Sequence, residues 1–369
     1  MKIAYFANTA WYLYNFRLTL LKQARGSGHE VLLISPEDEY VSSLRDEGFR
    51  WRRCPMDRKS LNPLKAGRVL LHLARVFWQE RPDLVHNFTL KSIVYGSLAA
   101  RLVAVPRRVN AIAGLGHYFA ASKGLDSIIG WTIRQLLRAS MVGSEVIFQN
   151  PDDLETVVRH QIASRDRCHL IRSSGVDIEI FSYRDDPSGP VTVLLASRML
   201  WSKGVDAFVE AARQLVKDGA DVRFVIAGVP DWGNPDAIPE ETLRDWDRLP
   251  GIEWWGFQDD MPQVIRQSHI VCLPTQYGEG VPKILTEAAA TGRPLVATDV
   301  AGCREVVHDG ENGFLVAPDD TDQLADSLRT LIRDSSKRKE MGERSRILAE
   351  EEFADERVIE KTLSVYEAA

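Results

Sequence analysis

The sequence predicts an α/β protein with two domains that each contain a parallel sheet. A chain of 369 residues and 41.5 kDa is longer than one hydrophobic core usually supports. It opens with an apolar strand over residues 2–6, a helix that ends near residue 25, and a second strand over residues 29–34. This β-α-β order is typical of parallel sheets. The same order starts again at residue 191, which indicates a second domain.

Short apolar runs separated by helical patterns predict the remaining strands. In the first domain we expect them over residues 83–86, 109–112 and 142–148, and in the second over 191–196, 222–227, 252–255, 270–273 and 295–298. The chain is predominantly helical and charged after residue 316. The proline- and glycine-containing run 185–190 reads as a linker. The first domain is therefore expected over residues 1–182 and the second over residues 190–352.

The two halves of the chain carry opposite net charge. Residues 1–171 contain 24 Lys and Arg against 15 Asp and Glu, a net charge of +9, whereas residues 172–369 contain 22 against 37, a net charge of −15. A basic half without nucleic-acid motifs indicates an anionic surface or ligand as its partner, and an anionic lipid leaflet is one candidate. No nucleic-acid partner is expected.

Cysteine usage and the N-terminus favour a cytoplasmic protein. The four cysteines are scattered without a C-x-x-C pair, which argues for a reducing compartment and against a zinc site. The first residues enter a strand directly instead of a signal peptide. No apolar run approaches the roughly 20 residues that span a bilayer. We expect no metal and no tightly bound cofactor.

The stretch from Tyr277 to Glu287 predicts the main binding site. Glu279 and Glu287 are separated by seven residues, and Pro282 suits the first turn of a helix that follows. The start of this helix offers unpaired N–H groups and a positive dipole end for phosphate, with Gly280 and Val281 in the loop before it. Two carboxylates at such a place indicate hydroxyl-rich groups on either side of the phosphate, which is the outline of a nucleotide sugar.

Two cations are expected at the same edge of the second sheet. Arg198 and Lys203 lie in the loop that follows the strand over residues 191–196, before a predicted helix. Cations at a diphosphate stabilise the charge that grows on it as the sugar leaves, so no divalent metal is required. Phe257 follows the strand over residues 252–255 at this edge. Asp259-Asp260 is interpreted as a helix start rather than a metal ligand pair.

In the first domain, polar residues follow several predicted strands. His86, Thr89 and Lys91 are expected in a loop at the carboxyl end of the strand over residues 83–86, where open parallel sheets bind ligands. Gly114 and Gly116 let the backbone approach a ligand closely, and His117 lies beside them.

Two more groups of the first domain have two interpretations each. Asn15 and Arg17 belong either to helix capping and exposed surface or to the ligand site. The helix over residues 64–79 carries Lys65, Arg68 and Arg75 beside an apolar face. It either packs on the sheet with its basic residues exposed or lies on a membrane.

These motifs resemble the family 4 retaining glycosyltransferases of the GT-B fold. The resemblance rests on Arg198 with Lys203, the E-x7-E of Glu279 and Glu287, the segment 299–307 and the run 312–316. It implies two Rossmann-like domains with parallel sheets that face each other across a cleft, with the last helix, 353–369, packed back on the first. It also implies Arg198 and Lys203 on the donor diphosphate, Glu279 near the sugar, Glu287 on the ribose, and metal-independent transfer with retention.

The first domain is similar to bacterial enzymes that extend polyprenyl-diphosphate-linked glycans, including N-acetylgalactosaminyltransferases of the PglA type. This likeness rests on Asn15-Phe-Arg17 and on the segments 83–91 and 114–119. It implies transfer of a sugar, best an N-acetylhexosamine, from a UDP-sugar at the inner face of the plasma membrane. Many relatives have His-x-His where this chain has His86 followed by Phe88, so either His86 or His117 takes that role. Many also have Gly-Gly where this chain has Asn8-Thr9.

Two other function classes fit the same fold. A sugar-nucleotide 2-epimerase needs acidic and histidine groups arranged for proton abstraction and elimination. A non-catalytic protein that binds nucleotide sugars needs only the donor site. Acceptor-independent isomerisation identifies the first, and tight binding without turnover identifies the second.

Overall fold

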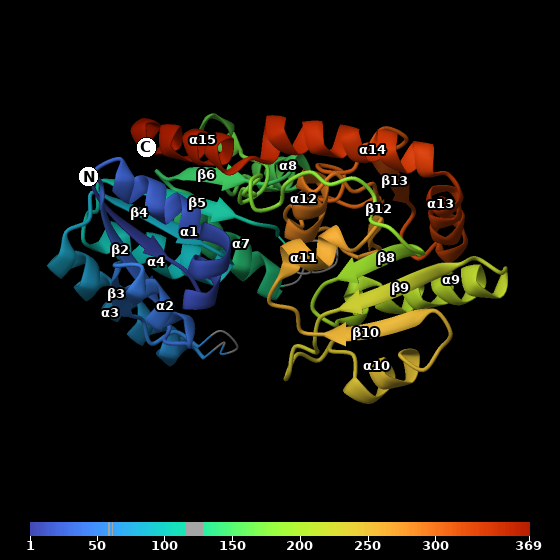
Figure 1. Cartoon of the computed structure of the whole chain (residues 1–369). Helices are drawn as coiled ribbons and strands as arrows, with labels where there is room; N and C mark the ends of the chain where they lie inside the picture. Colours follow the sequence, from blue (N-terminus) through green and yellow to red (C-terminus); the bar gives the residue numbers. More distant parts are fainter. Residues whose placement is uncertain (58–59, 61, 116–127) are drawn as a thin grey trace. The chain divides into compact units, whose positions relative to one another are not determined.

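The computed structural model describes residues 1–57, 60, 62–115 and 128–369, and these form two compact units. Unit 1 comprises Met1–Gly175 and Asp355–Ala369, and unit 2 comprises Val176–Ala354 (Figure 1). Unit 2 begins before the linker expected at 185–190, because the preceding segment packs into its core. The N–H of Val176 donates to the carbonyl oxygen of Phe353 at 2.9 Å, and Phe181 is buried among apolar residues of unit 2.

Unit 1 is built around a parallel seven-stranded sheet in the order β3-β2-β1-β4-β5-β6-β7. Its strands are β1 (Lys2–Phe6), β2 (Glu30–Ser35), β3 (Arg50–Arg53), β4 (Leu84–Phe88), β5 (Arg107–Ile112), β6 (Glu145–Phe148) and β7 (Cys168–Leu170). Its helices are α1 (Ala10–Gly26), α2 (Tyr40–Asp46), α3 (Pro63–Glu80), α4 (Leu90–Leu102), α7 (Ile128–Met141), α8 (Pro151–Arg159) and α15 (Asp355–Ala368). The chain reverses its direction of travel across the sheet between β1 and β4, and ligands bind at such switch points in open parallel sheets.

Helix α1 shows how the local sequence positions these elements. Thr9 caps it by accepting a hydrogen bond from the N–H of Tyr12 at 3.0 Å, and Leu13, Leu20 and Leu21 recur on its buried face. The C-terminal helix α15 packs into the same core cluster through residues such as Val358 and Tyr366. Residues from the two ends of the chain thus share one core.

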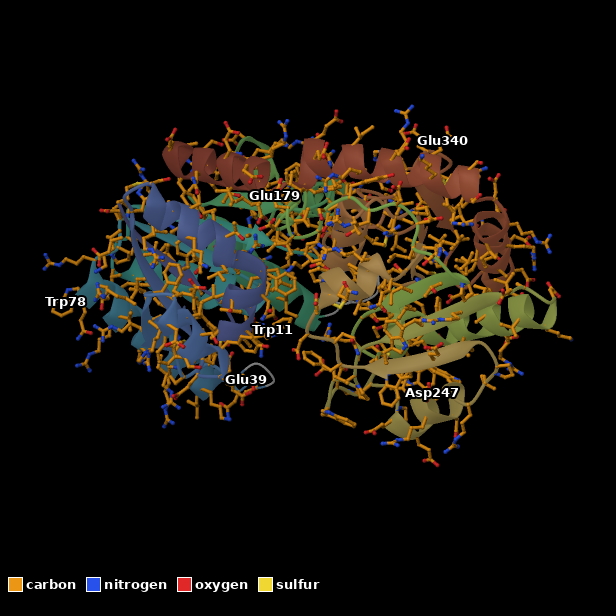
Figure 2. All side chains as sticks on the ribbon, viewed as in Figure 1. Trp11, Glu39, Trp78, Glu179, Asp247 and Glu340 are labelled. Atoms are coloured by element: carbon orange, nitrogen blue, oxygen red, sulfur yellow. The ribbon has the colours of Figure 1, made fainter. Side chains whose placement is uncertain are left out.

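Helix α3 covers a second core cluster of unit 1 with one face and exposes the other. Val69, Leu73 and Phe77 are buried against strand residues such as Phe6 and Ile34. Trp78 extends away from this core and is 65% exposed (Figure 2). Among the described residues, no helix is both long and apolar enough to cross a bilayer.

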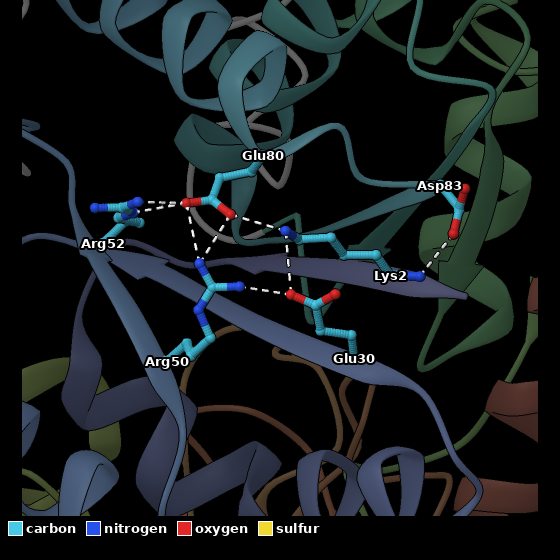
Figure 3. Close-up of polar contacts among 6 residues, drawn as sticks. All are labelled: Lys2, Glu30, Arg50, Arg52, Glu80 and Asp83. Atoms are coloured by element: carbon cyan, nitrogen blue, oxygen red, sulfur yellow. Dashed lines mark hydrogen bonds and ion pairs between the residues drawn. The ribbon is translucent and has the colours of Figure 1, made fainter.

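A buried carboxylate holds the amino ends of three strands together. Glu80, at the end of α3, accepts hydrogen bonds from Lys2 of β1 and from Arg50 and Arg52 of β3, while Glu30 of β2 pairs with Lys2 and Arg50 (Figure 3). Burial alone raises the pKa of Glu80, but the hydrogen bonds from Lys2 and Arg52 outweigh it and lower the pKa to about 2. This network lies at the amino ends of the strands, away from their carboxyl ends.

Unit 2 repeats the design with a parallel six-stranded sheet in the order β10-β9-β8-β11-β12-β13. Its strands are β8 (Val191–Ala196), β9 (Val222–Ala227), β10 (Ile252–Gly256), β11 (Ile270–Leu273), β12 (Leu295–Thr298) and β13 (Gly313–Val316). Its helices are α9 (Val205–Lys217), α10 (Glu240–Trp246), α11 (Met261–Arg266), α12 (Lys283–Ala290), α13 (Thr321–Arg333) and α14 (Ser335–Leu348), with a 3₁₀ turn at Trp201–Lys203 and a π-helical turn at Ala349–Phe353. Its switch point lies between β8 and β11. The prediction of two α/β domains with parallel sheets is confirmed.

Candidate active site

Three loops meet at the switch point of unit 2. The carbonyl oxygen of Ser202, after β8, accepts hydrogen bonds from the N–H of Gln276 at 2.9 Å and the hydroxyl of Thr275 at 3.1 Å, both after β11. The N–H of Glu279 donates to the carbonyl oxygen of Ala301, after β12, at 3.1 Å. Because these bonds tie the loops together, residues far apart in the chain face one another here.

Lys203 and Glu279 form an ion pair across these loops. The Nζ atom of Lys203 lies 2.5 Å from Oε1 of Glu279, and the hydroxyl of Thr275 lies 3.0 Å from the same oxygen. The two charged side chains are 14% and 29% exposed. The next residue, Gly204, has φ +68°, and a Cβ there would lie 1.9 Å from the carbonyl oxygen of Pro274. Only glycine allows this approach, which brings Lys203 beside the loop after β11.

Arg198 is held by a carboxylate that the sequence analysis did not identify. Its Nη1 atom lies 2.8 Å from Oδ2 of Asp231, in the segment after β9, and the two side chains are 57% and 36% exposed. An arginine has five N–H donors and a lysine three. One carboxylate on each of Arg198 and Lys203 therefore leaves further donors for an anion.

The loop before α12 packs tightly against the loop after β12. Pro282 is the N-cap residue of α12, so Gly280 and Val281 immediately precede the helix start. Gly302 has φ +85°, and a Cβ there would lie 1.8 Å from the carbonyl oxygen of Gly280. This contact fixes the backbone that leads from Glu279 into the helix.

Glu287 is the second carboxylate of the stretch and lies inside α12. Its side chain is 8% exposed, and its Oε1 atom lies 3.3 Å from Nζ of Lys283, one turn earlier. Burial raises the pKa of Glu287, although Lys283 acts in the opposite direction. The Lys283–Glu287 spacing of four residues is a signal for this pair that the sequence analysis did not use.

Phe257 lies at the carboxyl end of β10, two strands from β8. Its side chain is 64% exposed. The N–H of Gly228, after β9, donates to the carbonyl oxygen of Gly256 at 2.7 Å, and the N–H of Ser197 donates to that of Ala227 at 3.1 Å. These bonds place Phe257 and the Arg198 loop at the same edge of the sheet.

No cluster of three or more His, Cys, Asp or Glu side chains suited to a metal ion occurs in residues 1–57, 60, 62–115 and 128–369. Asp260 is the N-cap residue of α11 and accepts a hydrogen bond from the N–H of Gln263 at 3.0 Å. The interpretation of Asp259-Asp260 as a helix start is confirmed.

In unit 1, the prediction that His86 lies in a loop is wrong. Strand β4 continues to Phe88 and α4 begins at Leu90, so His86 lies within the strand and is 1% exposed. Its Nδ1 atom lies 2.7 Å from the hydroxyl of Tyr366 in α15. Burial and the nearby charge of Arg17 hold the pKa of His86 well below its usual range, so the ring is neutral at physiological pH.

Arg17 is buried beside His86 at the switch point of unit 1. Its Nη2 atom donates to the hydroxyl of Tyr12 at 3.0 Å, and its guanidinium lies 4.6 Å from the centre of the Phe88 ring. Arg17 and His86 line a cavity of about 10 Å³, enough for a single water. Within the described chain, neither Nε of Arg17 nor Nε2 of His86 has a hydrogen-bond partner. The interpretation of Arg17 as exposed surface is therefore wrong.

Thr89 and Lys91 mark the tight junction between β4 and α4. Thr89 has φ +71°, a strained conformation for a β-branched residue. Lys91 donates from Nζ to the carbonyl oxygen of Ser60 at 3.0 Å, and burial lowers its pKa. Such strain persists only where packing enforces it, and it concentrates at functional sites.

The other first-domain candidates belong to other elements or lie outside the described residues. Asn15 donates from Nδ2 to the carbonyl oxygen of Trp11 at 3.0 Å in α1. Gly114, with φ +128°, follows β5, and the N–H of Leu115 donates to Oδ2 of Asp153 at 3.1 Å. Gly116 and His117 lie outside the described residues.

Both units match family models of glycosyltransferases. Residues 2–150 match the model described as glycosyl transferase 4-like, and residues 190–334 match the model described as glycosyl transferases group 1.

Curated relatives cover most of the chain. An N,N'-diacetylbacillosaminyl-diphospho-undecaprenol alpha-1,3-N-acetylgalactosaminyltransferase of Campylobacter jejuni is 27% identical over 92% of this chain and 91% of its own. A UDP-Gal:alpha-D-GlcNAc-diphosphoundecaprenol alpha-1,3-galactosyltransferase of Escherichia coli is 23% identical over 81% of this chain and 79% of its own.

A solved structure shares the fold. Anabaena HepE in complex with UDP superposes with a TM-score of 0.80 over 100% of both chains, at 19% identity. This likeness shows that the chain has the GT-B fold, and the two family matches, one on each unit, show that it belongs to the glycosyltransferases, with a group 1 second unit and a glycosyl transferase 4-like first unit.

Proposed function

We propose that this glycosyltransferase moves a sugar, best an N-acetylhexosamine, from a UDP-sugar to a polyprenyl-diphosphate-linked glycan. The product would serve bacterial surface polysaccharide or glycoprotein glycan assembly at the inner face of the plasma membrane. The names of the Campylobacter and Escherichia relatives specify diphospho-undecaprenol acceptors, and the second name specifies a UDP-linked donor. The HepE structure contains UDP.

The Lys203–Glu279 ion pair at the switch point of unit 2 is the observation that carries this proposal. During transfer, the bond between the anomeric carbon and the diphosphate oxygen breaks, and its electron pair goes to UDP. Lys203 and Arg198 supply positive charge where that negative charge grows, and the N-terminus of α12 adds its dipole. The acceptor hydroxyl oxygen bonds to the anomeric carbon, and its proton passes to an oxygen of the departing diphosphate.

The two carboxylates take different roles in this proposal. Glu279, on the loop before α12, faces the transferred sugar with the backbone of Gly280, Val281 and Pro282. Glu287, within the helix, accepts hydrogen bonds from the ribose hydroxyls. Because Arg198 and Lys203 supply the positive charge at the diphosphate, the proposed transfer requires no divalent metal. Retention of configuration follows from the family resemblance.

The acceptor side of the proposal lies at the carboxyl end of β4 in unit 1. Arg17 supplies a buried positive charge there, and the Thr89 junction with Lys91 follows the strand. Asn15, Gly114 and Gly116 complete the proposed acceptor side. Either His86, whose imidazole is neutral, or His117 takes the role of a histidine near the donor sugar in this proposal.

UDP release from a panel of UDP-sugars, measured with and without a synthetic polyprenyl-diphosphate sugar, tests the proposal. We expect release to depend on the acceptor and to be fastest with a UDP-N-acetylhexosamine. Isomerisation of the donor without an acceptor, or tight donor binding without turnover, would contradict it. Adding a metal chelator is expected to leave the rate unchanged.

A further inference from the structure

We infer that the outward face of α3 is a docking surface for an anionic lipid bilayer. This inference rests on the proposed function, because it locates the membrane contact of that transferase. We call this surface the α3 face and define it as Leu64, Arg68, Leu71, Arg75 and Trp78. Leu64, Leu71 and Trp78 are 78%, 69% and 65% exposed, among the most exposed large apolar side chains of the described residues.

Helical geometry places these side chains in one stripe. Leu64, Leu71 and Trp78 follow one another at intervals of seven residues, which returns to nearly the same direction on a helix, with a drift of about 20° per interval. Arg68 and Arg75 fall between them on the same side. The buried residues Val69 and Leu73 lie two positions to either side of Leu71, or about 200° away around the axis. The stripe therefore points away from the core.

The charge around this stripe is almost entirely of one sign. Helix α3 packs beside α4, and α4 packs beside α7. Across their bounds, these three helices contain seven Lys and Arg and one acidic residue, Glu80. That residue is buried and bonded to Lys2 and Arg52, so it adds no negative charge to the surface. One exposed exception is Asp57, which lies 3.4 Å from Nζ of Lys65.

This combination fits a bilayer surface of negative charge. Leucine and tryptophan side chains enter the boundary between headgroups and acyl chains, and tryptophan is favoured at that depth. The long Arg68 and Arg75 side chains reach back to the lipid phosphates beside the stripe. A soluble acidic protein or a second copy of the chain is the competing occupant, and the experiment below separates them.

The test uses the full chain in flotation with vesicles of phosphatidylcholine alone and of phosphatidylcholine with phosphatidylglycerol. We expect binding to the anionic vesicles that weakens as salt rises. The double variant Leu71→Ser/Trp78→Ser should bind about tenfold less, because it removes inserted apolar groups. Arg68→Gln/Arg75→Gln should lower binding about fivefold for each charge and reduce the salt dependence.

Matched controls come from exposed residues of unit 2. Ile180→Ser/Ile347→Ser removes two exposed apolar side chains, and Arg213→Gln removes a charge with a side chain 60% exposed. Both should keep wild-type binding. Equal binding by the α3-face variants and these controls would overturn the inference. The inference would also be overturned if an α3-face variant bound vesicles like the wild type but changed its oligomeric state in sedimentation. The α3 face would then be a protein interface.

Transfer assays keep this inference separate from the proposed function. With a short-chain acceptor dissolved in water, the Leu71→Ser/Trp78→Ser variant should turn over at the wild-type rate. With a long-chain acceptor in anionic vesicles, the same variant should lose about tenfold. Turnover by this variant at the wild-type rate in vesicles would refute the α3 face as a membrane surface. No turnover by any enzyme on either acceptor would instead refute the proposed function, and the flotation result would then decide the role of the surface.

Discussion

Replacing Glu80 by glutamine tests how the amino ends of the strands in unit 1 are held together. The substitution keeps the size of the side chain and removes its charge. Lys2, Arg50 and Arg52 then lose a carboxylate whose side chain is 6% exposed, while their own side chains are 18%, 53% and 54% exposed. The two arginines can turn toward water, but Lys2 has less freedom to do so.

The pKa of Glu80 sets the scale of the effect. Its ordinary value of 4.5 falls to about 2 in the folded protein. One pKa unit corresponds to about 1.4 kcal/mol, so the folded environment favours the carboxylate by about 3 kcal/mol at neutral pH. Because two partners are half exposed and rehydrate in the variant, we expect the free energy of unfolding of unit 1 to fall by about 2–3 kcal/mol.

The sign of the pH dependence follows from the lowered pKa. A carboxyl with a lowered folded pKa contributes its full stability above its unfolded pKa of 4.5, and loses it as the pH falls toward the folded value of about 2. Calorimetry of the wild type and Glu80→Gln at pH 7 and near pH 3 measures this. The difference in free energy of unfolding should shrink to about half or less at the lower pH.

Glu37→Gln is the matched control for this experiment. Glu37 lies 3.5 Å from Arg53 at the surface, with a side chain 58% exposed. Its replacement should change stability by no more than about 0.5 kcal/mol. A difference between wild type and Glu80→Gln that is equally small, or that does not change with pH, would refute this account of the network.

Three further substitutions test single contacts. Gly302→Ala places a Cβ 1.8 Å from a backbone carbonyl oxygen of the loop before α12, so the KM for the donor should rise at least about tenfold in steady-state kinetics. Tyr366→Phe leaves Nδ1 of His86 without its partner, which should cost about 1–3 kcal/mol in thermal unfolding. Asp231→Asn releases Arg198 from a partly exposed ion pair, so the KM for the donor should fall, by no more than about fivefold.

The first two substitutions have controls, and all three have a contrary result. Gly310→Ala also has a positive φ, +78°, but its Cβ meets no atom within 4 Å, so an equal effect on KM would show that backbone strain alone explains Gly302→Ala. Tyr40→Phe is the comparison for Tyr366→Phe, and equal stability of the two variants would contradict the role of the hydroxyl. A higher donor KM in Asp231→Asn would show that Asp231 orients Arg198 instead of competing for it.

The strands that the sequence predicted best are those with continuous buried apolar runs. The bounds of β1, β8, β9, β11 and β12 agree with the prediction, because both faces of a parallel sheet are covered and nearly every side chain is apolar. Strand β3, Arg50–Arg53, was not predicted, because Arg-Trp-Arg-Arg has no apolar run. It forms a strand through backbone pairing with β2 and ion pairs with Glu30 and Glu80.

Polar residues in a buried strand misled the prediction at β4. His86 and Asn87 indicated a loop, but their hydrogen-bond partners come from distant parts of the sequence. His86 meets Tyr366, and Asn87 donates from Nδ2 to Oδ1 of Asn110 at 2.9 Å. A buried strand accepts such residues when their polar groups are bonded, and these partners are not visible in the local pattern.

The candidate site was partly visible in the sequence. Lys203 and Glu279 were both expected at the carboxyl ends of strands, since loops of that kind follow each strand of a parallel sheet. Their ion pair, and the pairing of Arg198 with Asp231, were not expected. Such pairs depend on how loops approach one another, as at Gly204 and Gly302, and that approach is a property of the folded backbone.

Transfer of labelled sugar from UDP to a polyprenyl-diphosphate sugar, by wild type and Lys203→Ala, tests the central claim most directly. Lys217→Ala, at the end of α9, is the matched control. Our account predicts transfer by the wild type and the control, and a loss of at least about a hundredfold in kcat for Lys203→Ala without loss of folding. Wild-type transfer by Lys203→Ala would contradict the claim that this cation stabilises the departing diphosphate.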